Sequence, residues 1–266
     1  MIGVLLTSTC YYDGIDKKTF SERVQELLDS ILSLKRRIRT PYELIIADNS
    51  PPDRVPTEKI LEFCPAHTLF IRSTHNPGKT VGEATLIRDG VYLSHARGHK
   101  WLLKLTGRYR LDGDWVLDDA IKQLEDKRKP MYLHLIGKTM KEMPWAKGHP
   151  CYAKNLDNEK ILMGVATQAF IVDPRYLAKS GALEKNFLYR EIEWVNCEQT
   201  FWRAVKGLDF LHWPDLPISG SVENKNSNVS VKTALESVSN PIFESTDNFS
   251  ELPCIDISPL IAAAQK

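Results

Sequence analysis

The feature that most constrains the fold is the alternation of short apolar runs with helix-like segments over the first 137 residues. Continuous apolar runs are typical of parallel strands, because helices cover both faces of such a sheet. Between these runs, apolar residues recur at helical spacing. The pattern predicts an α/β fold with a mostly parallel central sheet flanked by helices. The predicted strands are residues 2–6, 42–47, 68–72, 101–105 and 131–136.

The rest of the chain is more mixed. Strands are predicted at residues 164–172 and 208–213, and a long helix at 190–206. From residue 217 onward the chain is polar and rich in Ser and Asn, which is typical of a loop, a lid or a disordered tail. With 266 residues, 42% of them hydrophobic, the chain can build one main domain. The predicted domain covers residues 1–215, in halves 1–137 and 138–215, and a polar tail or lid covers 216–266.

Charge and cysteine content narrow the class of protein. A formal net charge of +1 gives no overall attraction to nucleic acid or to an anionic membrane. Five cysteines without CxxC spacing argue against both a disulfide framework and a zinc site, which favours a reducing cytoplasm. No stretch approaches the roughly 20 apolar residues that span a bilayer, so no transmembrane segment is predicted.

Two familiar nucleotide-binding motifs are absent. The loop after the first strand reads TSTCYYDG, and it contains neither GxGxxG nor the GxxxxGK of a P-loop. Ligands of parallel sheets bind outside the carboxyl ends of the strands. A nucleotide bound at that edge would therefore be held by side chains, from loops such as residues 7–11 and 48–50.

The order of several weak motifs resembles the GT-A class of glycosyltransferases, specifically the family 2 type. A strand ends in the acidic turn 48–50 (DNS), Asn-Pro-Gly at 76–78 precedes a helix, and Ala-Arg-Gly at 96–98 leads into an apolar strand. A later helix carries glutamates and ends in Lys-Gly. The resemblance covers roughly residues 2–215. It implies a nucleotide-sugar donor bound by the first half of the domain and an acceptor bound by the second half.

The resemblance, together with the chemistry that a nucleotide-sugar donor requires, suggests a set of donor-binding residues. Asp48 would contact the base or ribose, the two threonines after the first strand would hydrogen-bond the base, and a tyrosine would stack on it. The same residues also fit a turn-capping aspartate and an ordinary strand end. The set is Thr7, Thr9, Tyr11, Asp48, Asn76, Lys79 and Arg108.

The stretch KLTGRYRLDGDW, residues 104–115, departs from the family pattern. The family expects Asp-x-Asp after this strand, to hold Mg²⁺ or Mn²⁺ against the donor diphosphate, but Thr-Gly-Arg stands there. Arg108 could stabilise the leaving diphosphate without a metal. Asp112 and Asp114 could form a metal site after a longer turn. In a third interpretation the stretch is structural, with Asp114 as a helix N-cap. No cofactor is therefore certain, and Mg²⁺ or Mn²⁺ stays open.

An inverting transferase needs a carboxylate near the acceptor hydroxyl as general base. Glu198 shares a helix face with Phe201 and Val205, and a carboxylate on an apolar face needs a partner or a function. Family 2 enzymes often carry Glu-Asp in this region, whereas this chain has Glu198-Gln199. Glu198 is the predicted base and Glu191 the reserve, against a structural Glu198 paired with Arg203.

The predicted function is therefore transfer of a sugar from a nucleotide-sugar donor to a glycan or lipid-linked glycan. The near-neutral charge does not favour a nucleic acid acceptor. Two alternatives stay open: a sugar-nucleotide synthetase, and a glycan-binding protein without activity on a transferase fold. One local prediction concerns residues 19–22 (TFSE), which fit a capping box at the start of the first helix.

Overall fold

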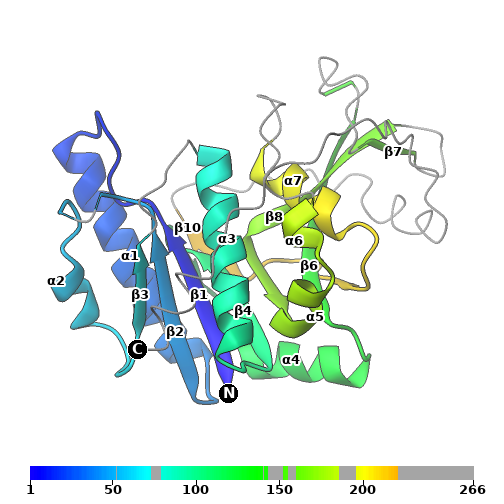
Figure 1. Cartoon of the computed structure of the whole chain (residues 1–266), viewed down its shortest axis with the longest axis horizontal. Helices are drawn as coiled ribbons and strands as arrows, with labels where there is room; N and C mark the ends of the chain where they lie inside the picture. Colours follow the sequence, from blue (N-terminus) through cyan, green and yellow to red (C-terminus); the bar gives the residue numbers. More distant parts are fainter. Residues whose placement is uncertain are drawn as a thin grey trace.

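The computed structural model describes residues 1–51, 53–72, 79–139, 141–142, 152–154, 160–185 and 196–220. A central sheet runs in the order β3-β2-β1-β4-β8-β6-β9, with β7 paired to β8 (Figure 1). Its strands are β1 (Ile2–Ser8), β2 (Tyr42–Asp48), β3 (Leu69–Arg72), β4 (Trp101–Thr106), β6 (Met131–Thr139), β7 (Tyr152–Lys154), β8 (Lys160–Val172) and β9 (Leu211–His212).

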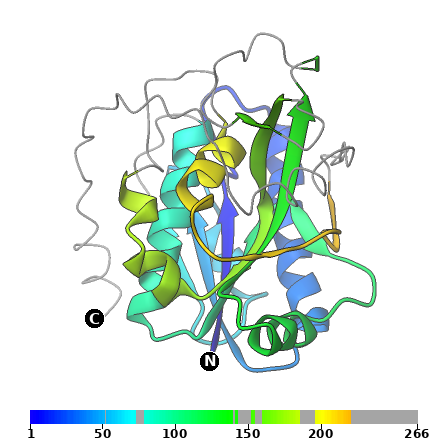
Figure 2. The same cartoon turned by 90° about the vertical axis from the view of Figure 1, so that its right-hand side faces the viewer.

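Helices cover both faces of this sheet (Figures 1 and 2). One apolar cluster joins the sheet to α3, α5, α6 and α7, and a second joins the other face to α1, α2 and α4. The predicted fold class, an α/β fold with a mostly parallel central sheet flanked by helices and a more mixed C-terminal part, is confirmed. The helices are α1 (Lys17–Arg37), α2 (Thr57–Leu61), α3 (Lys79–Ala96), α4 (Leu117–Asp126), α5 (Pro174–Lys179), α6 (Ala182–Lys185) and α7 (Cys197–Val205).

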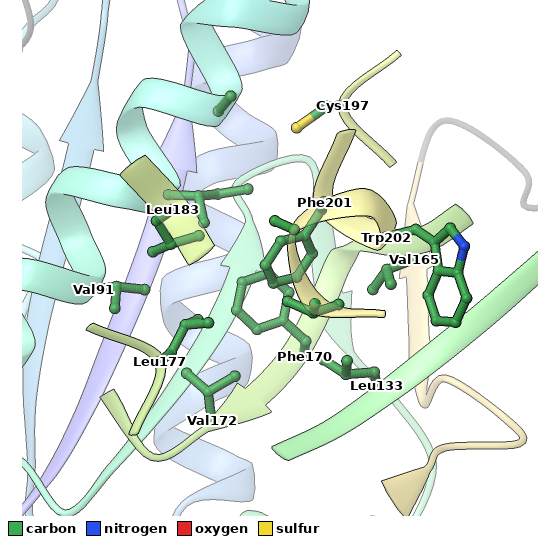
Figure 3. Close-up of a cluster of buried hydrophobic side chains, with 14 of the residues drawn as sticks. Val91, Leu133, Val165, Phe170, Val172, Leu177, Leu183, Cys197, Phe201 and Trp202 are labelled. Carbon is green, nitrogen blue, oxygen red and sulfur yellow. The ribbon is translucent and has the colours of Figure 1, made fainter. Parts of the chain in front are cut away.

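Alternation along the strands decides which helix each side chain meets. Successive strand residues point to opposite faces, so Leu5 packs in the cluster with α3 while Val4 and Leu6 pack in the cluster with α1. Figure 3 shows the first cluster where α7 meets the sheet, with Phe170 of β8 next to Phe201 of α7. Their ring centroids lie 4.7 Å apart.

The two neighbours of β4 run in different directions: β1 is parallel to it and β8 is antiparallel to it. β1, β2, β3 and β4 are parallel to one another, but β8 pairs antiparallel with both β4 and β6. The run at residues 131–136 was predicted as the fifth parallel strand. It is part of β6, which has the direction of β4 but is separated from it by β8.

β8 carries an irregularity that matters for the site. Leu133 pairs with Phe170 and Leu135 with Val165, so residues 166–169 form a bulge opposite a single residue of β6. Bulges redirect side chains and are frequent next to active sites. This bulge lies beside the carboxyl end of β4, where Leu105 pairs with Ala169.

A second, two-stranded sheet follows β4. β5 (Tyr109–Leu111) pairs antiparallel with β10 (Ile218–Gly220). Neither strand was predicted, since each is only three residues long. Residues 218–220, assigned by their composition to the polar tail, thus pair with a strand that directly follows the β4 turn.

Three predicted helix starts differ from the structure. Asp16, not Thr19, caps α1, and its carboxylate accepts from the Thr19 N–H at 2.9 Å. Both residues are cap-forming types, and the sequence alone did not distinguish them. α4 has Val116 rather than Asp114 at its N-cap. In the described residues α7 begins at Cys197, with Asn196 and Gln199 forming a capping box.

Candidate functional site

A cavity with a volume of about 800 Å³ lies at the carboxyl edge of the parallel strands. Its walls come from the loop after β1 (residues 7–13), the loop after β2 (49–51) and the turn after β4 (106–108). One side chain of α1 and two of α3 complete the described lining: Arg23, Glu83 and Leu86. This is the edge at which the strand pattern predicted a ligand.

Asp48 connects the loop after β1 with the loop after β2 through hydrogen bonds. It is 1% exposed, and its carboxylate accepts from the Ser8 hydroxyl, from the Ser50 N–H at 2.8 Å and from the Cys10 N–H at 3.3 Å. Burial, and next the Asp48 charge, raise the pKa of the Cys10 thiol. Asp48 itself is not among the residues that line the cavity. Its neighbours Asn49 and Ser50 are, so Asp48 acts on the cavity through the loops that it holds.

The predicted base-binding residues of the β1 loop do line the cavity. Thr9 donates to the Asn49 side chain, and the Tyr11 N–H donates to Ser50 Oγ at 2.9 Å. Thr7 is different, because the residue is 2% exposed and its buried hydroxyl has no hydrogen-bond partner in the described part of the chain. A buried hydroxyl without a partner costs free energy. Thr7 is among the residues that line the cavity, although its hydroxyl oxygen is itself buried.

The turn after β4 places Arg108 at the cavity. Ser30 of α1, fully buried, donates to the Gly107 carbonyl at 3.1 Å and to the Tyr109 carbonyl. Gly107 N–H donates to the Thr7 carbonyl at 2.8 Å, and a Cβ at this glycine would lie 2.9 Å from Leu27. A side chain at this position would require the buried Leu27 to shift. The half-buried Arg108 has no ion-pair partner among the residues that the structure describes.

The two aspartates of the opening stretch lie elsewhere. Asp112 and Asp114 follow β5, are exposed and do not line the cavity. A hydrogen bond with Ser219 is the main cause of a lowered Asp112 pKa. Within the described ranges, no group of three or more His, Cys, Asp or Glu side chains is placed to hold a metal ion. The two carboxylates therefore do not fit a metal that would contact a ligand in this cavity, and a metal site there stays a prediction without support from the geometry.

A buried ion pair lies at the β4 side of the cavity. Lys104, 0% exposed, donates to Glu83 Oε1 at 2.9 Å, to Thr106 Oγ1 at 2.6 Å and to the Thr167 carbonyl in the β8 bulge. Glu83 and Thr106 line the cavity, whereas Lys104 does not. Neither Glu83 nor Lys104 was predicted as a site residue. A signal existed for Lys104, since a lysine inside the apolar run WLLKLT needs a buried partner.

Glu198, the predicted general base, lies in the first turn of α7 and is half-buried. Gln168 of the β8 bulge is 3.5 Å from its carboxylate. The neighbouring Cys197 thiol is buried, and its pKa is raised by that burial and then by the charges of Glu83 and Glu198 (Figure 3). Glu198 directly follows the buried Cys197 in α7, but it is not among the residues that line the cavity.

Three predicted residues cannot be placed. Asn76 and Glu191 lie outside the described residues, and so does the side chain of Lys79 at the start of α3. The structure thus brings Thr7, Thr9, Tyr11 and Arg108 to one cavity. It adds residues that the sequence did not single out: Arg23 and Glu83 in the cavity lining, and Lys104, which binds Glu83.

Comparisons with known proteins give structural but not sequence matches. No protein-family model and no curated protein sequence matches this chain. The chain is similar in structure to a protein of Desulfovibrio desulfuricans G20 described as a nucleotide-diphospho-sugar transferase. The identity is 10%, the match covers 89% of this chain and 96% of that one, and the TM-score is 0.48.

Two further similar structures are S. aureus TarS 1-349, solved with UDP-GlcNAc, and a 4-diphosphocytidyl-2C-methyl-D-erythritol synthase of Anaerococcus prevotii. The first has 12% identity and a TM-score of 0.49, and covers 85% of this chain and 60% of that one. The second has 10% identity and a TM-score of 0.43, and covers 90% and 94%. Similarity at these levels carries no information about the reaction or its substrates.

Proposed function

We propose that the protein is a glycosyltransferase that moves a sugar from a nucleotide-sugar donor to a hydroxyl group of a glycan or lipid-linked glycan. The observation that supports this most is the cavity of about 800 Å³ at the carboxyl edge of the sheet. Its size suits a ligand of this kind, and its polar lining comes from three strand-end loops. The family 2 resemblance of the sequence points to the same reaction.

The nucleoside of the donor would lie over β1 and β2. Thr7 offers a buried hydroxyl without a partner in the described residues, and Asn49 and Ser50 offer polar groups on the neighbouring loop. The ring of Tyr11, already in edge contact with Phe20 at 6.0 Å, lines the same end and suits stacking on a base. Asp48 would support this end by holding both loops.

The diphosphate would lie at the turn after β4, against Arg108. Breaking the sugar–phosphate bond leaves negative charge on the diphosphate, and a guanidinium donates charge-assisted hydrogen bonds to such a group. Ser30 and Gly107 keep the turn in place, so the cation is positioned before the ligand arrives. In this proposal Thr-Gly-Arg takes the position of the acidic metal motif.

Glu198 would act as general base on the acceptor. It lies on α7, in the half of the domain assigned to the acceptor, and Gln168 is 3.5 Å from it. Its carboxylate would take the proton of the acceptor hydroxyl as the hydroxyl oxygen bonds to the anomeric carbon and the diphosphate departs with the electrons of the broken bond. Attack opposite the leaving group inverts the configuration of that carbon.

The rival functions predict different ligands. A sugar-nucleotide synthetase attacks a phosphate of a nucleoside triphosphate, and a glycan-binding protein needs no nucleotide. No specific observation in the described residues favours either one. A cytoplasmic location is part of the proposal, since Cys10, Cys64 and Cys197 are free thiols. No helix in the described part of the chain is long and apolar enough to cross a membrane.

A thermal-shift screen tests the proposal. A panel of nucleotide sugars, nucleoside diphosphates and nucleoside triphosphates is added with Mn²⁺ or with a chelator, and release of nucleoside diphosphate is then measured for each ligand that stabilises the protein. We expect one nucleotide sugar to stabilise it and to be hydrolysed slowly without acceptor. Stabilisation by a triphosphate plus a sugar phosphate would instead establish the synthetase. No response to any nucleotide would refute both enzymes.

A further inference from the structure

Lys104 is a fully buried lysine in the middle of an apolar sheet. Burying an ammonium group without partners is expensive, so its three protons should all be accepted. They are: Glu83 Oε1, Thr106 Oγ1 and the Thr167 carbonyl each accept from Nζ. No proton of Lys104 is left for a ligand. Its effect on a ligand must therefore pass through the groups that it holds.

The group that it holds most directly is the Glu83 carboxylate. Oε1 of Glu83 is bound by Lys104 Nζ at 2.9 Å and lies 3.3 Å from Thr106 Oγ1. For Oε2, no hydrogen-bond partner is recorded within the described residues. The side chain is 23% exposed and lines the cavity. One oxygen is thus fixed by the protein, and the other remains available to accept a hydrogen bond in the cavity.

The charge of this arrangement indicates what Oε2 would accept from. Glu83 and Lys104 together are neutral, so the pair offers no net negative charge to attract a cation. A carboxylate oxygen also repels phosphate, which has its cation at Arg108 on the same cavity. Neutral hydroxyl groups are the ligands that remain, because they donate to a carboxylate without changing its charge.

The position along the cavity agrees with this chemistry. The nucleoside end is assigned to the loops after β1 and β2, and the diphosphate to Arg108 after β4. A sugar follows the diphosphate, so it would lie further along, toward β8 and α7. Glu83 fits this position, since Lys104 links it to the β8 bulge and its helix α3 packs with α7 in one apolar cluster.

We propose that Glu83 binds hydroxyl groups of the transferred sugar and that Lys104 is the positioning residue that fixes Glu83 for this task. This assignment rests on the proposed function and deepens it, because it names the residue that distinguishes a nucleotide sugar from its bare nucleoside diphosphate. Arg108 and the β1 loop bind the diphosphate and the nucleoside, which both ligands contain. Glu83 binds the sugar, which only the nucleotide sugar contains.

Calorimetric titration with two probes tests the proposal: the nucleotide sugar that stabilises the wild type best, and the matching nucleoside diphosphate. In E83Q we expect affinity for the nucleotide sugar to fall about tenfold or more, because a hydrogen bond to a charged group is lost. Affinity for the diphosphate should stay within about twofold of wild type, since charged contacts to phosphate are unchanged. E58Q, an exposed glutamate substitution on α2, is the matched control and should change neither affinity.

A second variant guards against misfolding. E83M/K104M replaces both charges with apolar groups, which folded proteins tolerate better than a lone buried charge. It should lose the same preference for the nucleotide sugar while melting as one cooperative transition. If E83Q and the double variant keep the wild-type preference, the proposal is overturned. It is also overturned if the wild type binds the diphosphate as tightly as the nucleotide sugar. If the wild type binds no nucleotide, the proposed function is refuted, and this inference, which rests on it, is refuted as well.

Discussion

Two buried charged clusters lie at opposite ends of the same sheet. At the carboxyl end, Lys104 holds Glu83 beside the cavity. At the amino end, Glu43 of β2 is bound by Arg97, with Nη2 at 2.6 Å and Nε at 3.0 Å, and His99 Nε2 lies 3.1 Å from its Oε2. Both clusters are built from a glutamate and a cation, but of the two glutamates Glu83 lines the cavity at the carboxyl edge and Glu43 does not.

The difference lies in unused hydrogen-bonding capacity. Both oxygens of Glu43 are occupied by protein groups, and His99 Nδ1 is occupied by the Ser94 hydroxyl at 2.9 Å. Ser94, His99 and Glu43 have the order of a nucleophile, a base and an orienting carboxylate. All three are buried, with Ser94 and His99 at 0% exposure, so no substrate can reach the hydroxyl. A buried charge marks a binding site only where part of its capacity is left open to a ligand.

The largest expected effect is on catalysis when Arg108 is replaced, and replacement of a neighbouring arginine provides the comparison. R108A should lower the rate of nucleoside diphosphate release by about 10²–10³-fold, because the leaving charge loses its cation. The nearby R110A is the control, since Arg110 is exposed and binds Ser219 at 2.8 Å. Steady-state kinetics measure both. Release by R108A within threefold of wild type would exclude Arg108 from the phosphate site.

At the amino end the expected effect is on folding. E43A should lower the free energy of unfolding by about 2–3 kcal/mol, since it leaves Arg97 and His99 without their shared carboxylate. Urea denaturation measures the loss. Nucleotide-sugar affinity of the folded variant should equal that of wild type. A change in that affinity would mean that the two ends of the sheet are coupled and that the comparison fails.

The pH dependence of stability should report His99. Burial is the main cause of its lowered pKa, so His99 is neutral in the folded protein at and above its ordinary value of 6.5. As pH falls below 6.5, the unfolded chain takes up a proton that folded His99 does not, and stability falls by at most about 1.4 kcal/mol per pH unit from this group. H99Q should flatten that fall. His212 is half-buried, and burial also lowers its pKa, so it should leave a residual slope of the same sign.

The smallest expected effects concern one hydroxyl group at each end of the sheet, that of Thr7 at the carboxyl end and that of Ser94 at the amino end. T7V removes a buried hydroxyl that has no partner in the described residues, so stability should change by no more than about 0.5 kcal/mol while nucleotide affinity falls about fivefold. S94A removes the partner of His99, so stability should fall by about 1 kcal/mol while affinity stays unchanged. Equal stability losses in the two variants would contradict the assignment of Thr7 to a ligand.

Local patterns predicted much of the fold. The continuous apolar runs located β1, β2 and β4, and helical spacing located α1 and α3. The neighbour of β4 was not predicted, because insertion of β8 depends on contacts between segments that are far apart in the chain. Strand pairing of this kind leaves no signature in any one segment.

The site was predicted less completely than the fold. Loops at strand ends could be identified from their position, and this placed Thr7, Thr9, Tyr11 and Arg108 at the cavity. Glu83 could not be found in this way, since it lies inside a helix and gains its setting only from Lys104 on β4. The roles of all these residues stay predictions until ligand binding is measured.

The pairing of β5 with β10 has a consequence for how the protein matures. Ile218 pairs with Leu111, so the strand that follows Arg108 finds its partner only in a segment that is made much later than the strand itself. A growing chain could form the parallel strands early. β5, which follows Arg108, would stay without its partner β10 until residues 218–220 had been made. The turn that carries Arg108 would therefore reach its final form later than the parallel strands beside it.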